Sequence, residues 1–306
     1  MAYTTWIYKL PLTLYIACSN IYQEFSALPT ASTLSNNFFR SLWIIAQFEL
    51  VRLFATRRGL LTLFTFGIVW YFMLTGLVMT AADFIQQNAS GNMSSMMLNS
   101  AGFGQLLAWP IAEFSAYWRL SLYLFPIFCV LFAADQTASD RDRGSLRFLT
   151  MRCSRDSIFL GRFVGQMIIQ SILIILTLLS TFIVAVYNNA EALMASIQCV
   201  LLISGNLFFV LLPFTAMMAL LSAAVRSPRQ AMIFAVLIWT LVSATLTSIS
   251  QHWPIFEFLT YLIPGVHLEK LTELQPSETL SLAYIPVLQT LVLLFIGRFV
   301  MARGSV

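Results

Sequence analysis

The chain is 306 residues long, 59% of them hydrophobic and only 10% charged, with a mean hydropathy of +0.81. A soluble domain could not cover that much apolar surface, so the composition excludes a soluble protein and indicates a membrane protein. The formal net charge is +4 and the pI is about 9.0, but the basic residues follow the membrane topology described below and give no support for nucleic-acid binding.

The first 37 residues are predicted to form a cytosolic N-terminal extension, 1–37. Residues 6–17 are apolar, but they are too short to span a bilayer and they contain Lys9 and Pro11. We interpret them as a cytosolic or surface-lying segment rather than as a signal peptide. Residues 20–37 are rich in Ser, Thr and Asn and have no periodic apolar face, which is typical of a linker.

Residues 38–58 consist of helix-forming residues and contain neither Gly nor Pro. Glu49, Arg52 and Thr56 recur at offsets of three and seven, so a helix places them on one face. This pattern predicts an amphipathic helix in the membrane interface that turns into the first span at Gly59. The alternative is that this helix packs on other protein. In either case residues 38–58 carry a broad apolar surface that includes Trp43, Ile44, Phe48, Leu50 and Phe54.

Six apolar runs follow, each of about 18 to 27 residues. At a rise of about 1.5 Å per residue, each run can cross a hydrocarbon core of about 30 Å with some tilt. We therefore predict an all-α polytopic membrane protein whose residues 59–306 form a six-helix transmembrane domain. The predicted spans are 60–80, 117–134, 163–187, 199–225, 231–249 and 282–301.

The basic residues gather in alternate segments between these runs. Fifteen of the 17 Lys and Arg residues lie before the first run, between the second and third, between the fourth and fifth, or at and after the end of the sixth. Only Arg119 and Lys270 lie on the other side. Because segments rich in Lys and Arg are retained in the cytosol, this asymmetry predicts that both ends of the chain and the segment 135–162 are cytosolic.

The segments on the other side of the membrane carry few charges. Residues 81–115 include an apolar patch at 106–112, which is typical of a cover over the outer leaflet. Residues 250–281 contain an apolar stretch that is too short to span and is broken at Pro264 and Gly265. This pattern predicts a re-entrant pair of short helices before the last span.

The segment 135–162 alternates arginines and aspartates with apolar residues. Amphipathic pieces of this kind can press an apolar ridge into a soluble partner while the flanking ion pairs set the register. Ser154, followed by Asp156 and Ser157, predicts the N-cap of a short helix. The alternative is a solvated loop whose arginines only satisfy the charge bias, and the spacing alone leaves both interpretations open.

Polar residues are sparse within the spans. Hydrogen bonds between helices explain most of them, and a few are candidates for lining a translocation path. Gly161-x-x-x-Gly165 predicts that the third span approaches a neighbour closely at its cytosolic end. With no charge deep inside a span, we expect no proton-coupled or ion-coupled mechanism. The candidate path residues are Gln166, Gln170, Asn206, Thr215 and Ser243.

The chain has no pattern that predicts catalysis of its own. It has no G-x-x-x-x-G-K-[ST] phosphate-binding loop, so we do not expect it to hydrolyse ATP. The four cysteines form no C-x-x-C pair, and His252 and His267 lie fifteen residues apart. These spacings predict neither a metal site nor a directly bound cofactor.

The segment between the second and third runs resembles the signature of type-2, ABCG-like ABC transporter permeases. In that family an acidic residue precedes a Gly-Thr/Ser-Leu step, an aliphatic run and a Ser-Arg pair. The matching stretch is DRDRGSLRFL at 140–149, followed by Ser154-Arg155 and Gly161-Arg162. An aspartate stands where the family usually has glutamate, and the proline that often precedes Ser-Arg is absent. The family's order of an elbow helix, six spans, a coupling helix between spans two and three, and a re-entrant pair also matches.

This resemblance implies a permease subunit in the inner (cytoplasmic) membrane whose coupling helix receives motion from a separate ABC ATPase. ATP and Mg²⁺ would be bound by that ATPase, and a second permease copy or a homologue would complete a dimer. A periplasmic accessory protein is a further candidate partner. The residues implied to couple to the ATPase are Asp140, Gly144, Ser145, Leu146, Arg147, Leu149, Arg155, Asp156 and Phe159.

Two functions agree with this resemblance. In the first, the subunit exports an amphipathic, peptide or drug-like substrate, which suits its apolar spans. In the second, it transports nothing through its centre and relays ATPase motion to a periplasmic protein docked on residues 81–115 and 250–281. A membrane scaffold or channel unrelated to ABC transporters is a third, structurally different alternative.

Overall fold

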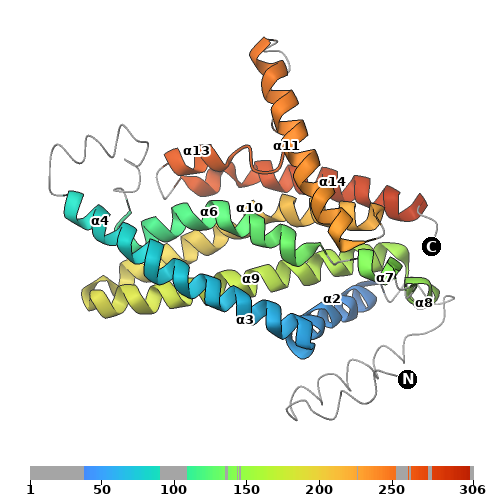
Figure 1. The fold of residues 1–306 in the computed structure, drawn as a ribbon, viewed down its shortest axis with the longest axis horizontal. Helices are drawn as coiled ribbons and strands as arrows, with labels where there is room; N and C mark the ends of the chain where they lie inside the picture. Colours follow the sequence, from blue (N-terminus) through green and yellow to red (C-terminus); the bar gives the residue numbers. More distant parts are fainter. Residues whose placement is uncertain are drawn as a thin grey trace.

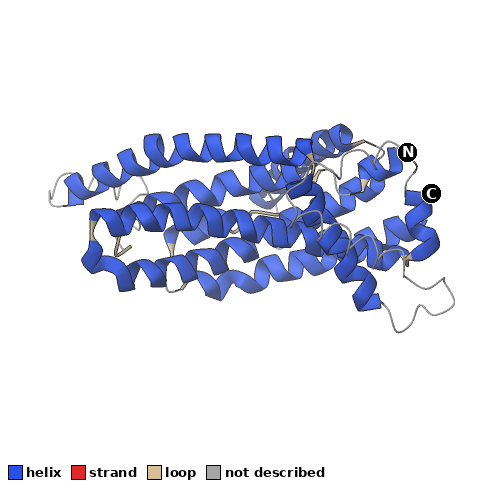
Figure 2. Ribbon diagram, turned by 90° about the horizontal axis from the view of Figure 1, so that it is seen from below, coloured by secondary structure: helices blue, strands red, loops and turns tan. Residues whose placement is uncertain are grey.

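The structure is a computed structural model that describes residues 38–89, 109–134, 137–142, 144, 146–225, 227–252, 261, 263–274 and 278–303. All regular structure in these residues is helical, which confirms the predicted all-α fold class. Most of the long helices run side by side along the long axis of the molecule (Figure 1 and Figure 2). The predicted extension 1–37 lies outside the described residues.

Six helices in the described part of the chain are long and apolar enough to cross a membrane, as predicted. They are formed by α3 (Arg57–Phe72) with the π-helix η3 (Met73–Val78) and α4 (Met79–Ala89), α6 (Ala112–Ala133), α9 (Arg155–Asn188), α10 (Leu193–Ala224), α11 (Pro228–His252) and α14 (Tyr284–Arg303). The shorter helices are α2 (Phe38–Ala55), α7 (Ala138–Asp142), α8 (Leu146–Arg152), η5 (Ala190–Ala192), α13 (Leu268–Glu273) and η7 (Thr279–Ala283).

α9 and α10 form the centre of the bundle, with 34 and 32 residues. At about 1.5 Å per residue they extend roughly 50 Å, so both project beyond a hydrocarbon core of about 30 Å. α10 packs against α6, α9 and α14. Pro126 lies inside α6 and Pro213 inside α10, whereas α9 has no proline and runs from one end of the bundle to the other.

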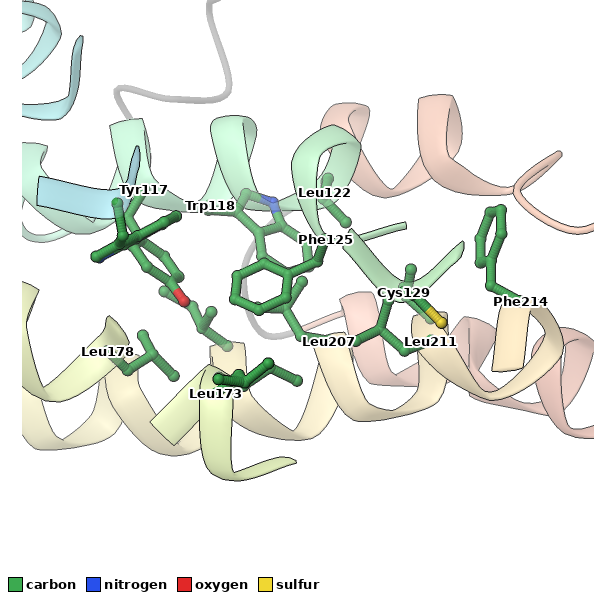
Figure 3. Packing of buried hydrophobic residues seen from close by; sticks show 14 of the residues in the cluster. Tyr117, Trp118, Leu122, Phe125, Cys129, Leu173, Leu178, Leu207, Leu211 and Phe214 are labelled. Atoms are coloured by element: carbon green, nitrogen blue, oxygen red, sulfur yellow. The ribbon is translucent and has the colours of Figure 1, made fainter. Parts of the chain in front are cut away.

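Side chains of α6, α9 and α10 fill the core between these helices (Figure 3). The Tyr117 hydroxyl lies 2.9 Å from Thr177 Oγ1, and Cys129 Sγ lies 3.2 Å from Thr215 Oγ1. Because lipid tails are as apolar as the helices, such packing and hydrogen bonds are what hold spans together. Other buried members of this core are Trp118, Leu122, Phe125, Leu207 and Leu211.

α2 packs along the first turns of α9, at the end of the bundle that also carries α7 and α8 (Figure 1). We call this the α8 end. A methyl group on Gly161 would lie 2.8 Å from the Leu42 carbonyl oxygen, and one on Gly165 would lie 2.9 Å from Glu49 Cβ. Only glycine permits this approach, so the close contact predicted from Gly161-x-x-x-Gly165 is made with α2.

The two sides of α2 differ from those predicted. Ile44 and Glu49 are both 1% exposed, whereas Trp43 is 51% and Phe48 49% exposed. The sequence groups Glu49 with polar neighbours, but its carboxylate turns into the protein, where Arg162 of α9 meets it. The apolar side chains therefore divide between a side that packs on α9 and a side that faces outward.

Replacing Gly161 with Ala is expected to destabilise the chain by about 1–3 kcal/mol, because the new methyl group would overlap the backbone of α2. Thermal unfolding of the purified protein measures this loss. The matched control is Gly67→Ala in α3, where a methyl group meets nothing within 4 Å. Equal melting temperatures for the two variants would contradict the close packing of α2 on α9.

At the opposite end of the bundle, side chains of two spans hold the segment that leads into α13. Gln289 Nε2 of α14 donates a hydrogen bond to the Ile263 carbonyl oxygen at 3.0 Å. Trp239 Nε1 of α11 donates to the Pro264 carbonyl oxygen, also at 3.0 Å. Residues 253–260, where the first helix of the predicted re-entrant pair falls, lie outside the described residues, so the pair stays a prediction.

Candidate functional site

The connection between the second and third spans lies at the α8 end of the bundle. It consists of the short helices α7 and α8 and leads into the first turn of α9. Gly144, between α7 and α8, has a φ of +70°, in the left-handed region that favours glycine. The Ser154 hydroxyl accepts a hydrogen bond from the Ser157 backbone N–H at 3.1 Å and so caps α9. The predicted N-cap is confirmed, but it begins the 34-residue α9 rather than a short helix.

α8 has one buried and one exposed side. Leu146 is only 1% exposed and belongs to a cluster that includes Ile44 of α2 and Ile158 of α9. On the other side, Phe148 is 70% and Met151 is 62% exposed. Two exposed arginines flank these apolar side chains. We call the set the outer face of α8: Arg147, Phe148, Met151 and Arg152.

The predicted coupling residues divide between the surface and the interior. Leu146 and Phe159 are buried, and Phe159 packs against Gly297 of α14 so closely that a side chain there would collide with its ring. Leu149 is half-buried and packs on the same cluster. Ser145 lies outside the described residues. The interior members thus support α8 from within, and the coupling role of the whole set stays a prediction.

Arg155 and Asp156, also predicted to couple, connect the start of α9 with the end of α14. Arg155 Nη1 donates to the Ala302 carbonyl oxygen at 2.9 Å and to that of Met301 at 3.3 Å. A cation is favourable there because the last carbonyls of a helix carry partial negative charge. Asp156 Oδ2 lies 2.8 Å from Arg298 Nη2. A displacement of the first turn of α9 would therefore be passed to α14.

Buried charges link α7, α9 and α2. Arg162 Nη2 donates to Asp140 Oδ2, and Arg162 Nε lies 4.0 Å from Glu49 Oε1. Arg52 Nη2 lies 3.3 Å from Glu49 Oε2. The side chains of Arg162 and Glu49 are 2% and 1% exposed, so these charges are largely desolvated and depend on their partners. We call the four residues the ion chain: Arg52, Glu49, Arg162 and Asp140.

Three charged residues of this site were not predicted from the sequence, namely Glu49, Arg141 and Arg162. Arg141 Nη1 donates to the Ala223 carbonyl oxygen at 2.5 Å, at the end of α10. One signal was available: an acid in a largely apolar helix and an arginine at the start of an apolar span are seldom buried unless they are paired. The sequence could not identify the partners, because they lie on different helices.

Four of the five candidate path residues are buried inside the chain, namely Gln166, Gln170, Asn206 and Thr215. Asn206 Nδ2 donates to Thr279 Oγ1 at 2.8 Å, and Thr215 pairs with Cys129 in the core. Ser243 lies on α11 and donates to a backbone carbonyl one turn earlier in the same helix. These residues contact their own chain, and their role in a translocation path stays a prediction.

No group of three or more His, Cys, Asp or Glu side chains in the described part of the chain could hold a metal ion. Beside α8, burial raises the pKa of the Cys153 thiol, and the Ser41 hydrogen bond and the nearby charge of Arg152 oppose this shift only in part. The thiol is therefore protonated at neutral pH. A reactive cysteine needs a lowered pKa, so the environment of Cys153 favours packing over chemistry.

His267, which lies just before α13, is buried, and burial lowers its pKa from 6.5 to about 4. Between pH 6.5 and about 4, the unfolded chain therefore binds more protons than the folded chain. Stability should be fully present above pH 6.5 and fall by about 1.4 kcal/mol per pH unit toward pH 4. His267→Phe is expected to remove this dependence, measured as the change in melting temperature from pH 7 to 5. Identical shifts in both proteins would contradict it.

These observations define a class of protein: a polytopic helical membrane protein with an exposed amphipathic helix between its second and third spans. A family model described as ABC-2 family transporter protein matches residues 36–300. No curated protein matches the chain. The match covers most of the sequence, so the chain belongs to the ABC-2 transporter family and is the permease component of an ABC transporter. The permease of this family is not itself the ATPase and partners with an ABC ATPase.

Proposed function

We propose that this permease couples ATP hydrolysis by a separate ABC ATPase to the export of an amphipathic, peptide or drug-like substrate. The observation that carries this proposal is the outer face of α8, where Phe148 and Met151 are exposed between two arginines. An exposed apolar pair outside the spans is typical of a surface that a protein partner covers. The arginines can pair with acidic groups on the surface of the ATPase that covers α8.

Contacts behind the outer face of α8 support a mechanical role for residues 137–162. Arg141 contacts the end of α10, Arg155 the end of α14, and Arg162 the side of α2. Leu146 anchors α8 itself to the same end of the bundle. A push on α8 would therefore reach three helices at once, which is how we propose that closure of the ATPase subunits moves the spans.

Exposed helices support the proposal that a second permease copy or a homologue is needed. α11 leaves the other helices (Figure 1) and exposes apolar side chains along most of its length. α3 exposes an apolar surface that includes Leu60, Phe64 and Tyr71. Because the interior of one chain is filled by the core, we propose that the substrate passes between two permeases, beside such surfaces.

We also propose that the α8 end faces the cytosol of a cell with an inner membrane. A cysteine introduced at Phe148 should then react with a membrane-impermeant maleimide only after the inner face is opened. A cysteine at Tyr187, which is 89% exposed at the far end of α9, should react from outside. Both would be placed in a chain whose native cysteines are replaced. Reaction of the cysteine at position 148 from outside would show that the orientation is the opposite of the one proposed.

Purification from native membranes under mild detergent tests the function. The tagged chain is expected to bring down an ABC ATPase in equal amount, and its absence would contradict the proposal. In nanodiscs, stimulation of ATP hydrolysis by an amphipathic substrate supports export. Stimulation only by a protein added on the side opposite α8 would instead favour a relay to a periplasmic partner and overturn the export proposal.

A further inference from the structure

The ion chain contains two acids and two arginines, so its formal charge is zero. Its two central members, Arg162 and Glu49, are almost fully buried, whereas the terminal ones are less so, with side-chain exposures of 17% for Asp140 and 25% for Arg52. The charges thus run from α7, through the first turns of α9, to Glu49 and Arg52 on one face of α2. They form a polar connection between three helices, alongside the apolar cluster in which Leu146 of α8 packs with Ile44 of α2 and Ile158 of α9.

Close apolar contacts also pack α2 on α9. Gly161 and Gly165 already bring the two helices into contact, and Ile44 and Ile45 fill the space between them. A buried ion pair is also a weak source of stability, because apolar residues of similar volume often stabilise as well or better. Stability alone therefore does not account for an ion chain at this position.

The short helix α7 depends on polar contacts. It has five residues, and hydrogen bonds or ion pairs from Asp140 and Arg141 join it to α9 and α10. Gly144, between α7 and α8, has its backbone in the left-handed region, and its N–H donates a hydrogen bond to the Arg141 carbonyl oxygen at 3.1 Å. A movement of α8 that reaches α7 is therefore passed to α2 through Asp140.

We propose that the ion chain transmits the displacement of α8 to α2, with Arg162 as the positioning residue at its centre. This inference rests on the proposed function, because it requires an ATPase that pushes on α8. Arg162 donates a hydrogen bond to Asp140 of α7 and lies 4.0 Å from Glu49 of α2, at ion-pair distance. Its planar, always charged guanidinium can hold both carboxylates at once, which a lysine ammonium would do less specifically.

Hydrogen exchange of the complete permease–ATPase complex in nanodiscs tests the transmission. Amide exchange is compared without nucleotide and after trapping with ATP and vanadate. In the unmodified chain, trapping is expected to change exchange in both α8 and α2. In Asp140→Asn and in Glu49→Gln, the change in α8 should remain and the change in α2 should be lost. Each variant leaves Arg162 one acidic partner, so the complex should still assemble.

Control variants separate transmission from folding and from direct ATPase contact. Asp140→Glu should restore the change in α2, and Glu191→Gln, an exposed acid at the opposite end, should leave it intact. Glu49 is buried and cannot reach the ATPase, so its variant excludes a direct contact. If the response of α2 is unaltered in both test variants, or if both fail to assemble with the ATPase, the proposed role of the ion chain is wrong. Failure of the unmodified chain to bind an ATPase would instead overturn the proposed function.

Discussion

Replacing Phe148 with Asp is expected to weaken binding of the ABC ATPase by roughly 30-fold or more, while membrane insertion and folding are unchanged. Phe148 is 70% exposed and lies at the middle of the outer face of α8, so it has the position of an interface anchor. Loss of a central anchor typically costs about 2 kcal/mol or more, and a carboxylate there would also be desolvated by the partner. Titration of the ATPase against the permease in nanodiscs measures the affinity.

Phe39→Asp provides the matched control for this substitution. Phe39 is 82% exposed on α2, outside the outer face of α8, and the change introduces the same charge. ATPase affinity is expected to be unchanged in this variant. Equal affinities for Phe148→Asp and the unmodified chain would show that the ATPase docks elsewhere.

Replacing Arg162 with Ala is expected to destabilise the permease by about 3–5 kcal/mol, the largest effect on stability that we predict. The change removes the cation that pairs with both Glu49 and Asp140, and Glu49 is only 1% exposed. A buried carboxylate then loses one of its charged partners and cannot regain water without a local opening of α2. The midpoint of unfolding in detergent, measured by heat or denaturant, reports this loss.

Two further variants identify the cause. Arg303→Ala removes an exposed arginine from the last turn of α14 and should change the midpoint little. Adding Glu49→Gln and Asp140→Asn to Arg162→Ala should recover part of the lost stability, because the orphaned charges are removed as well. If the triple variant is no more stable than Arg162→Ala, the loss comes from the packing of the arginine side chain rather than from its charge.

The six spans were predictable because hydrophobic length is a local property of the sequence. The run at 163–187 falls within α9, which extends further at both ends. The run at 199–225 matches α10 (Leu193–Ala224) except that the helix begins earlier and ends one residue before the run does. The cap at Ser154 and the close approach at Gly161 and Gly165 were predictable for a related reason. A cap and a glycine pair act through backbone geometry, which nearby residues determine.

The candidate site was harder to predict because α8 is only seven residues long. Leu146, Phe148, Leu149 and Met151 are all apolar, and spacing alone does not show which of them face the protein. The structure buries Leu146 against α2 and leaves Phe148 exposed. That choice depends on α2, which lies about a hundred residues earlier in the sequence. Local pattern therefore located the segment but not its contact surface.

The long-range partners of the arginines could not be predicted from the sequence pattern for the same reason. Arg155 contacts a carbonyl 147 positions away, and Arg141 contacts one 82 positions away. A single sequence shows that these charges need partners, but the partners become visible only once the helices are arranged. The positive-charge bias accounts for the number of arginines in 135–162, and the contacts of Arg141, Arg155 and Arg162 account for where those three lie.

The length of α9 has a mechanical consequence. One continuous helix of 34 residues begins beside α8 and ends where Asn188 donates a hydrogen bond to Glu113 at the mouth of α6. If α9 tilts as a rigid rod about its first turns, where the ion chain lies, a tilt of about 5° would carry its far tip by roughly 4 Å. A small stroke at one membrane surface can thus open a gap at the other without any helix having to unwind.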